Sequence, residues 1–180
     1  MPMKLLKKGI VVVFPGSRGT EIPLLYYGSK HFEDIGYEKL FIDYSMISQP
    51  SFETVFENAY NILKNMNWAE YEEVVFIGKS LGTVVACKIK ERLQVPAKLI
   101  LFTPLEETLP FIHKDNDVLL VAIGDEDPWL SSTVLLEHCK INEVTCHVEH
   151  GVGHRMEVKN DLQRNLEIVL KVLSYLSIAA

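Results

Sequence analysis

The hydrophobic residues of this chain are concentrated in six short runs separated by longer stretches of mixed polarity. Most of the runs are continuously apolar and rich in Val, Ile and Leu, which is typical of strands with both faces covered. The last run alternates apolar and polar positions, which favours a strand at the edge of a sheet. The predicted strands are Ile10 to Phe14, Leu40 to Ile42, Val74 to Ile77, Leu99 to Phe102, Val118 to Ile123 and Val144 to Val148.

Three stretches have the apolar period of an amphipathic helix. The first covers residues 51–68, with Ser51 placed to act as its N-cap, and the second begins at Leu81. The third lies near the carboxyl end, where Asn160-x-x-Gln163 resembles a capping box. We expect this last helix to be the longest of the chain.

Strands that alternate with helices predict an α/β protein. The expected fold is a three-layer sandwich, with a mostly parallel six-stranded sheet and helices on both of its faces. The connection between Phe102 and Val118 has room for only a short helix or a loop. With no internal repeat or linker, the 180 residues are expected to form one domain, 1–180.

Composition narrows the choice of partners and compartment. A net charge of -6 argues against nucleic acid and against an anionic membrane surface as main partners. No apolar run is long enough to cross a bilayer, and the amino terminus lacks the pattern of a secretory signal. Three cysteines without metal-like spacing are expected to be reduced thiols. Together these features predict a cytoplasmic protein.

The most informative motif is Gly78-Lys79-Ser80-Leu81-Gly82, which follows a predicted strand and opens a predicted helix. A serine in such a tight turn exposes its hydroxyl as a nucleophile, and the glycines let strand and helix approach closely. Ser80 could instead be a simple helix cap. A phosphate-binding loop would need a glycine at position 73, which is Glu73.

A serine nucleophile needs a histidine base and a carboxylate that orients the histidine. The turn after the fifth strand supplies Asp125 and Asp127, and Pro128 biases Asp127 toward an extended backbone, which favours it as the acid. The turn after the sixth strand supplies His150 and His154. His154 is favoured because it lies far enough along its glycine-rich loop to reach back over the sheet.

A metal site is the alternative interpretation of His147, His150 and His154, whose spacing suits one face of a helix. Gly151 and Gly153 would break such a helix. We therefore expect no bound metal.

These motifs, in this order, resemble those of the α/β-hydrolase superfamily, in a compact form without a cap and similar to small dienelactone-hydrolase-like esterases. The resemblance implies an oxyanion hole formed by the backbone N–H groups of Leu81 and Ser17. The loop after the first strand departs from the family's common His-Gly, because it has Pro15-Gly16. Some relatives carry the acid after the preceding strand, which would be Glu106 or Glu107.

The chain is thus expected to be a serine hydrolase that cleaves a small-molecule ester or thioester through an acyl-enzyme, with no cofactor. Gly16, Arg18 and Lys79 are candidate substrate contacts, although an exposed Arg18 could simply be solvated. Two alternatives remain at this point. One is an acyltransferase with the same catalytic residues, and the other is a binding protein that keeps the fold without turnover.

Overall fold

The computed structural model describes residues 6–16, 22–48 and 51–176. The six strands form one sheet in the order β2-β1-β3-β4-β5-β6, and every pairing is parallel. All six predicted strands are confirmed, and the last of them lies at an edge as expected. Their bounds are β1 Lys7–Phe14, β2 Glu38–Phe41, β3 Tyr71–Lys79, β4 Ala97–Phe102, β5 Val118–Gly124 and β6 Cys146–Glu149.

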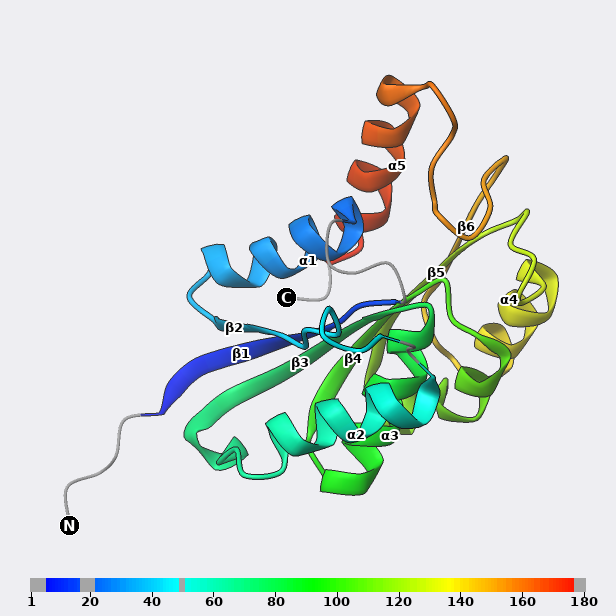
Figure 1. Ribbon diagram of the computed structural model, residues 1–180. Helices are drawn as coiled ribbons and strands as arrows, with labels where there is room; N and C mark the ends of the chain where they lie inside the picture. Colours follow the sequence, from blue (N-terminus) through cyan, green and yellow to red (C-terminus); the bar gives the residue numbers. More distant parts are fainter. Residues whose placement is uncertain (1–5, 17–21, 49–50, 177–180) are drawn as a thin grey trace, which may run out of the picture.

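Helices cover both faces of the sheet, so the predicted three-layer architecture is confirmed (Figure 1). Helices α1 (Pro23–Asp34) and α5 (Leu162–Ser174) pack on one face through residues such as Leu25, Phe32 and Ile168. The strands present Val11, Val13, Val75, Ile77, Ile100 and Phe102 to these helices.

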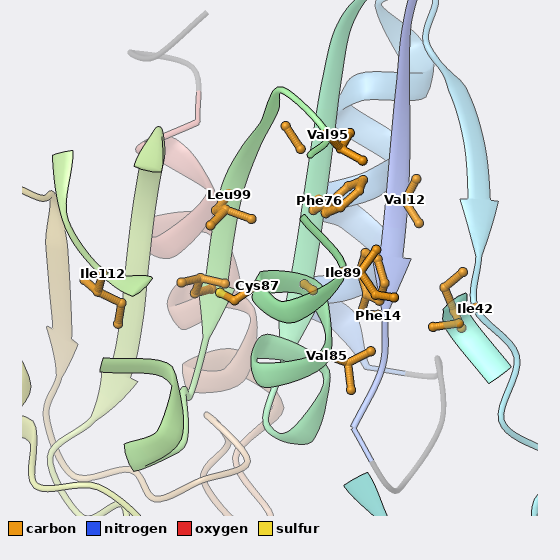
Figure 2. Close-up of a cluster of buried hydrophobic side chains, with 14 of the residues drawn as sticks. Val12, Phe14, Ile42, Phe76, Val85, Cys87, Ile89, Val95, Leu99 and Ile112 are labelled. Atoms are coloured by element: carbon orange, nitrogen blue, oxygen red, sulfur yellow. The ribbon is translucent and has the colours of Figure 1, made fainter. Parts of the chain in front are cut away.

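The opposite face packs against α2 (Phe52–Leu63), α3 (Leu81–Leu93) and α4 (Ser132–Ile141). Figure 2 shows Phe14 and Phe76 beside Ile89 of α3, and the two phenyl rings lie 5.0 Å apart. Because successive strand residues point to opposite faces, the central strands must be apolar at nearly every position. This requirement explains the continuous apolar runs of the sequence.

The helix ends follow local chemistry. Ser51 caps α2 as predicted, since its Oγ accepts the N–H of Thr54 and its own N–H donates to Thr54 Oγ1. The predicted capping box at Asn160 is wrong, because Asn160 has a left-handed backbone (φ 60°). Asp161 caps α5 instead by accepting the N–H of Arg164. Helix α5 is also no longer than α3, since each has 13 residues.

Helices α1 and α4 are not among the three stretches in which the sequence shows a clear helical period. The buried side of α1 includes Gly28 and Ser29, which interrupt its apolar stripe. In α4, Val134 and Leu136 are exposed, so its apolar residues do not mark a single face. The connection after β4 holds only short helical turns, as predicted, and these are the 3-10 turns Glu106–Phe111 and Lys114–Asn116. A further 3-10 turn, Trp68–Glu70, precedes β3.

The parallel arrangement brings the carboxyl ends of all six strands to one edge of the sheet, where open α/β sheets place their sites. The loops that follow β1, β3, β5 and β6 carry the motifs singled out in the sequence. None of the helices in the described segments has both the length and the apolar character needed to cross a bilayer.

Gly82 lies where α3 packs tightly against the end of β1, and we predict that Gly82→Ala strongly destabilises the protein. A β-carbon at position 82 would lie 2.0 Å from the carbonyl oxygen of Phe14. Backbone must shift to relieve this overlap, at a cost of about 2–3 kcal/mol or more in the free energy of unfolding. Denaturation in urea measures the effect.

Gly28→Ala is the matched control, because a β-carbon there would make contacts no shorter than 3.6 Å. Alanine also suits a helix better than glycine does. We therefore expect Gly28→Ala to be neutral or slightly stabilising. Equal stability of the two variants would contradict the close-approach argument.

Candidate active site

Ser80 sits in a sharp turn between β3 and α3. Its backbone has φ 54° and ψ -125°, a conformation that residues other than glycine rarely adopt. The turn is compact because Gly78 and Gly82 have no side chains. A β-carbon on Gly78 would lie 2.7 Å from the Gly82 carbonyl oxygen. This is the nucleophile-elbow geometry that the sequence motif predicts.

Hydrogen bonds on both sides hold the strained turn. The Ser80 N–H donates to the carbonyl of Phe102 at 3.0 Å. On the other side, the carbonyl of Ser80 accepts the Thr83 N–H at 2.9 Å and the Thr83 hydroxyl at 2.7 Å. Thr83 Oγ1 also lies 2.8 Å from Thr108 Oγ1. Both the N–H and the carbonyl of Ser80 are therefore hydrogen-bonded, and these bonds offset the strain of its backbone.

His154 joins the serine to a buried carboxylate. Its Nε2 lies 2.8 Å from Ser80 Oγ, and its Nδ1 lies 2.8 Å from Asp127 Oδ2. The Asp127 side chain has no exposed surface, whereas 21% of the His154 side chain is exposed. An Nδ1–H that donates to Asp127 leaves Nε2 free to accept the Ser80 proton. The structure thus brings together three residues that the sequence separates by up to 74 positions.

Asp125, the alternative acid, forms its hydrogen bonds with residues other than His154. Its carboxylate accepts the Gly151 N–H at 2.8 Å and lies 2.9 Å from Nδ1 of the exposed His150. These hydrogen bonds, first that of His150 and then that of Gly151, hold the pKa of Asp125 below its usual value. His147, the third histidine of the group, lies 2.7 Å from Glu149. The three histidines therefore face three different carboxylates.

Gly124 explains how the acid loop and the histidine loop come together. A β-carbon on Gly124 would lie 2.1 Å from the Val152 carbonyl oxygen, so only glycine allows this approach. The same carbonyl accepts the Glu126 N–H at 3.0 Å. The Gly124-x-x-Asp127 pattern thus places Asp127 within reach of His154.

The histidine loop is anchored at several points. Val152 and Met156 are buried in the core formed with α1 and α5. Farther along, the side-chain amide of Asn165 bonds both the N–H and the carbonyl of Val158, at 2.6 and 3.0 Å. The backbone around His154 is therefore fixed on both sides.

Lys79, a predicted substrate contact, is instead buried beneath the site. Only 3% of the residue is exposed. Its Nζ donates to Thr103 Oγ1 at 2.9 Å and to the carbonyl of His154 at 2.8 Å. Burial lowers the pKa of Lys79 to about 8, while the charges of Asp127 and Glu157 oppose the shift. The lysine therefore ties the serine turn to the histidine loop.

Glu149 forms a second buried support, between β6 and α5. Its side chain is 1% exposed, and its carboxylate accepts a hydrogen bond from Arg164 and lies 3.1 Å from Lys171 Nζ. Burial raises the pKa of Glu149, but the bonds to His147, Lys171 and Arg164 outweigh it and hold the pKa below the ordinary value. This cluster anchors both ends of the segment that carries His154.

The expected oxyanion hole is described in part. Leu81 is the first residue of α3, so its N–H has no acceptor within the helix. Gly16 lies against the serine, because a β-carbon there would be 3.1 Å from Ser80 Cβ and 3.7 Å from Ser80 Oγ. Ser17 and Arg18, the predicted oxyanion donor and substrate contact, lie outside the described residues.

Sequence reasoning did not find the supporting residues. For Lys79 a signal was present, because it continues the alternation of Val75 and Ile77, which face α1 and α5. The contact between Thr83 and Thr108 had no comparable signal. It depends on how a 3-10 turn folds over the start of α3.

Removal of the buried lysine gives a pH-dependent prediction. In the unfolded chain Lys79 has its ordinary pKa of 10.5, whereas in the folded protein the pKa is about 8. Between these values the unfolded state binds more protons, so this group makes stability rise with pH. We expect the free energy of unfolding of wild type, minus that of Lys79→Met, to increase by about 3 kcal/mol across this window.

Chemical denaturation at a series of pH values measures this difference. Lys64→Met, which removes an exposed lysine, is the matched control. A wild-type-minus-variant difference that stays flat from pH 8 to 10.5 would contradict a buried, partly deprotonated Lys79.

Comparison with known proteins agrees with this architecture. The sequence matches no family model and no curated protein. An alpha-beta serine hydrolase homologue from Coxiella burnetii has a TM-score of 0.67 and 15% identity, over 94% of this chain and 85% of that one. XC6422 from Xanthomonas campestris, described as an a/b serine hydrolase without lid, has a TM-score of 0.66 and 13% identity, over 99% and 85%.

Est1E from Butyrivibrio proteoclasticus, in a structure with ferulic acid bound, is similar to the same extent. Its TM-score is 0.67 at 14% identity, over 97% of this chain and 91% of that one. At such identities the likeness concerns the fold. The six parallel strands, the covering helices and these neighbours together show that the chain has the α/β-hydrolase fold.

Proposed function

We propose that this protein is a serine hydrolase that cleaves a carboxylic ester or thioester through an acyl-enzyme. The observation that carries the proposal is the continuous hydrogen-bond chain from Asp127 through His154 to Ser80, with both contacts at 2.8 Å. The neighbours that are named as serine hydrolases support it.

In the proposed mechanism, Ser80 Oγ attacks the substrate carbonyl while His154 Nε2 takes the hydroxyl proton. The negative charge that develops on the carbonyl oxygen is stabilised by the N–H of Leu81 and, in the expected arrangement, by that of Ser17. His154 then donates its proton to the leaving oxygen or sulfur as the bond to the acyl carbon breaks. Water then attacks the acyl-enzyme while His154 Nε2 takes its proton. His154 returns this proton to Ser80 Oγ as the bond to the acyl carbon breaks, which frees the acid and restores Ser80.

Asp127 has two roles in this scheme. Through Oδ2 it holds the His154 ring with Nε2 toward the serine, and its charge stabilises the imidazolium that forms in each step. Through Oδ1 it accepts the backbone N–H of Trp129 at 2.9 Å. Both carboxylate oxygens are thus bonded, which prevents the carboxylate from rotating away from the histidine.

An uncapped site fits small or accessible substrates. His154 keeps a fifth of its side chain exposed, so a substrate can reach it from solvent. The neighbour from Xanthomonas campestris is described as lacking a lid, which supports this proposal. An acyltransferase would use the same acyl-enzyme and differ only in the final acceptor.

Burst kinetics with 4-nitrophenyl acetate test the proposal. We expect a rapid release of one nitrophenolate per protein molecule, followed by slower turnover, because nitrophenolate is a good leaving group and acylation of Ser80 is expected to be faster than hydrolysis of the acetyl-enzyme. Ser80→Ala should abolish both phases, since Ser80 is the proposed nucleophile. Unchanged turnover in Ser80→Ala would show that the observed hydrolysis does not use the proposed site.

A second prediction separates the two aspartates. Asp127→Asn should lower kcat by about 10³–10⁴-fold, because the amide favours the wrong histidine tautomer. Asp125→Asn is the matched control, since Asp125 bonds His150 and Gly151 rather than His154. Steady-state kinetics measure both variants, and equal losses of kcat would contradict the assignment of Asp127 as the orienting acid.

A further inference from the structure

Trp129 is an unusually exposed tryptophan beside the candidate site. It follows the acid loop directly, and 66% of it is exposed. Tryptophan is highly buried on average, because its large apolar surface is costly to leave in water. The other tryptophan of the chain, Trp68, packs against the hydrophobic core. An exposed indole at this position therefore offers apolar surface that a ligand can cover.

The backbone that carries the indole is held by the same carboxylate that holds the base. Asp127 Oδ1 accepts the Trp129 N–H at 2.9 Å, while Asp127 Oδ2 lies 2.8 Å from His154 Nδ1. On the other side, Leu130 is buried in the core and fixes the chain after the tryptophan. The indole and the imidazole meet edge to face, with ring centres 6.4 Å apart.

The contact with His154 tells which part of a substrate the indole would meet. A general acid must lie within hydrogen-bond distance of the atom that it protonates. In the proposed reaction His154 protonates the leaving group, so the leaving group lies beside the imidazole. In the same scheme the acyl carbon lies at Ser80 and its oxygen at the Leu81 amide, whereas the indole is in contact with His154.

We propose that Trp129 forms the leaving-group subsite, and that the site prefers esters whose alcohol portion is flat and apolar, such as an aromatic ring. The inference rests on the proposed function and names its substrate class. An aromatic alcohol would pack on the indole and cover its exposed surface. Paired aromatic rings attract each other beyond the effect of buried area alone, which favours a flat ring over a saturated one.

The test keeps the acyl group constant and varies only the alcohol. Benzyl, cyclohexylmethyl and methyl acetate all give the same acetyl-enzyme, so differences in kcat/KM arise in binding and acylation. Acetate release is measured for wild type, Trp129→Ala and Trp129→Phe. Leu170→Ala, which removes an equally exposed apolar side chain from α5, is the matched control.

We expect Trp129→Ala to lower kcat/KM for benzyl acetate by about tenfold and to leave methyl acetate unchanged. Cyclohexylmethyl acetate should show a smaller loss, and Trp129→Phe should recover most of the benzyl activity. Leu170→Ala should change none of these values.

Other outcomes overturn the inference in recognisable ways. An equal loss for all three acetates would mean that the indole acts on His154 rather than on the alcohol. Methyl phenylacetate, which carries the ring on the acyl side, is assayed as a fourth ester, and a loss seen with it but not with benzyl acetate would place the aromatic subsite on the acyl side. No change in any substrate would leave Trp129 without a binding role.

Failure of the proposed function has a different signature. If wild type and Ser80→Ala release acetate equally slowly from every ester, the serine is not a nucleophile and both proposals fall. If Ser80→Ala is inactive while Trp129→Ala retains the wild-type preference for benzyl over methyl acetate, only the leaving-group subsite is overturned.

Discussion

The turn at Ser80 is the constraint on which the rest of the site depends. A side-chain-bearing residue at φ 54° is unfavourable by itself, and it persists because the surroundings leave no alternative. Gly78 and Gly82 let the strand and helix close around it, and the Phe102 carbonyl and Thr83 bond its backbone. The result is a hydroxyl that projects from the carboxyl edge of a rigid parallel sheet.

The buried charged side chains next to the site hold the His154 loop in place. The ammonium of Lys79 bonds the His154 carbonyl, and Glu149 ties β6 to α5 through charged partners. Gly124 lets the histidine loop lie directly on the end of β5. Buried charges are costly unless they are well bonded, and both groups have such partners. Together, these contacts fix the position of the His154 loop and hence the distance from His154 to Ser80.

The sequence predicted the strands well because central parallel strands need apolar side chains on both faces, a requirement that is visible in one dimension. The residues Ser80, Asp127 and His154 could also be picked out from the sequence, since each follows a recognisable strand. Helices α1 and α4 lack a clear helical period in the sequence, because Gly28 and Ser29 interrupt the apolar stripe of α1 and Val134 of α4 is exposed.

Other features depend on contacts between distant segments. The sequence offered both Asp125 and Asp127 as the acid and favoured Asp127, and the structure adds that Asp125 bonds His150 and Gly151 rather than His154. Lys79 was expected at the substrate because it adjoins Ser80. Its burial follows from the alternation of β3, and its partner Thr103 comes from a different strand end.

In the proposed mechanism, this geometry activates Ser80 as a nucleophile. Intact-mass analysis after treatment with a fluorophosphonate tests the claim without any assumption about the substrate. We expect a single adduct on wild type that maps to Ser80, is absent from Ser80→Ala and forms far more slowly in His154→Ala. A folded wild-type protein that forms no adduct, or one that reacts equally well without His154, would contradict it.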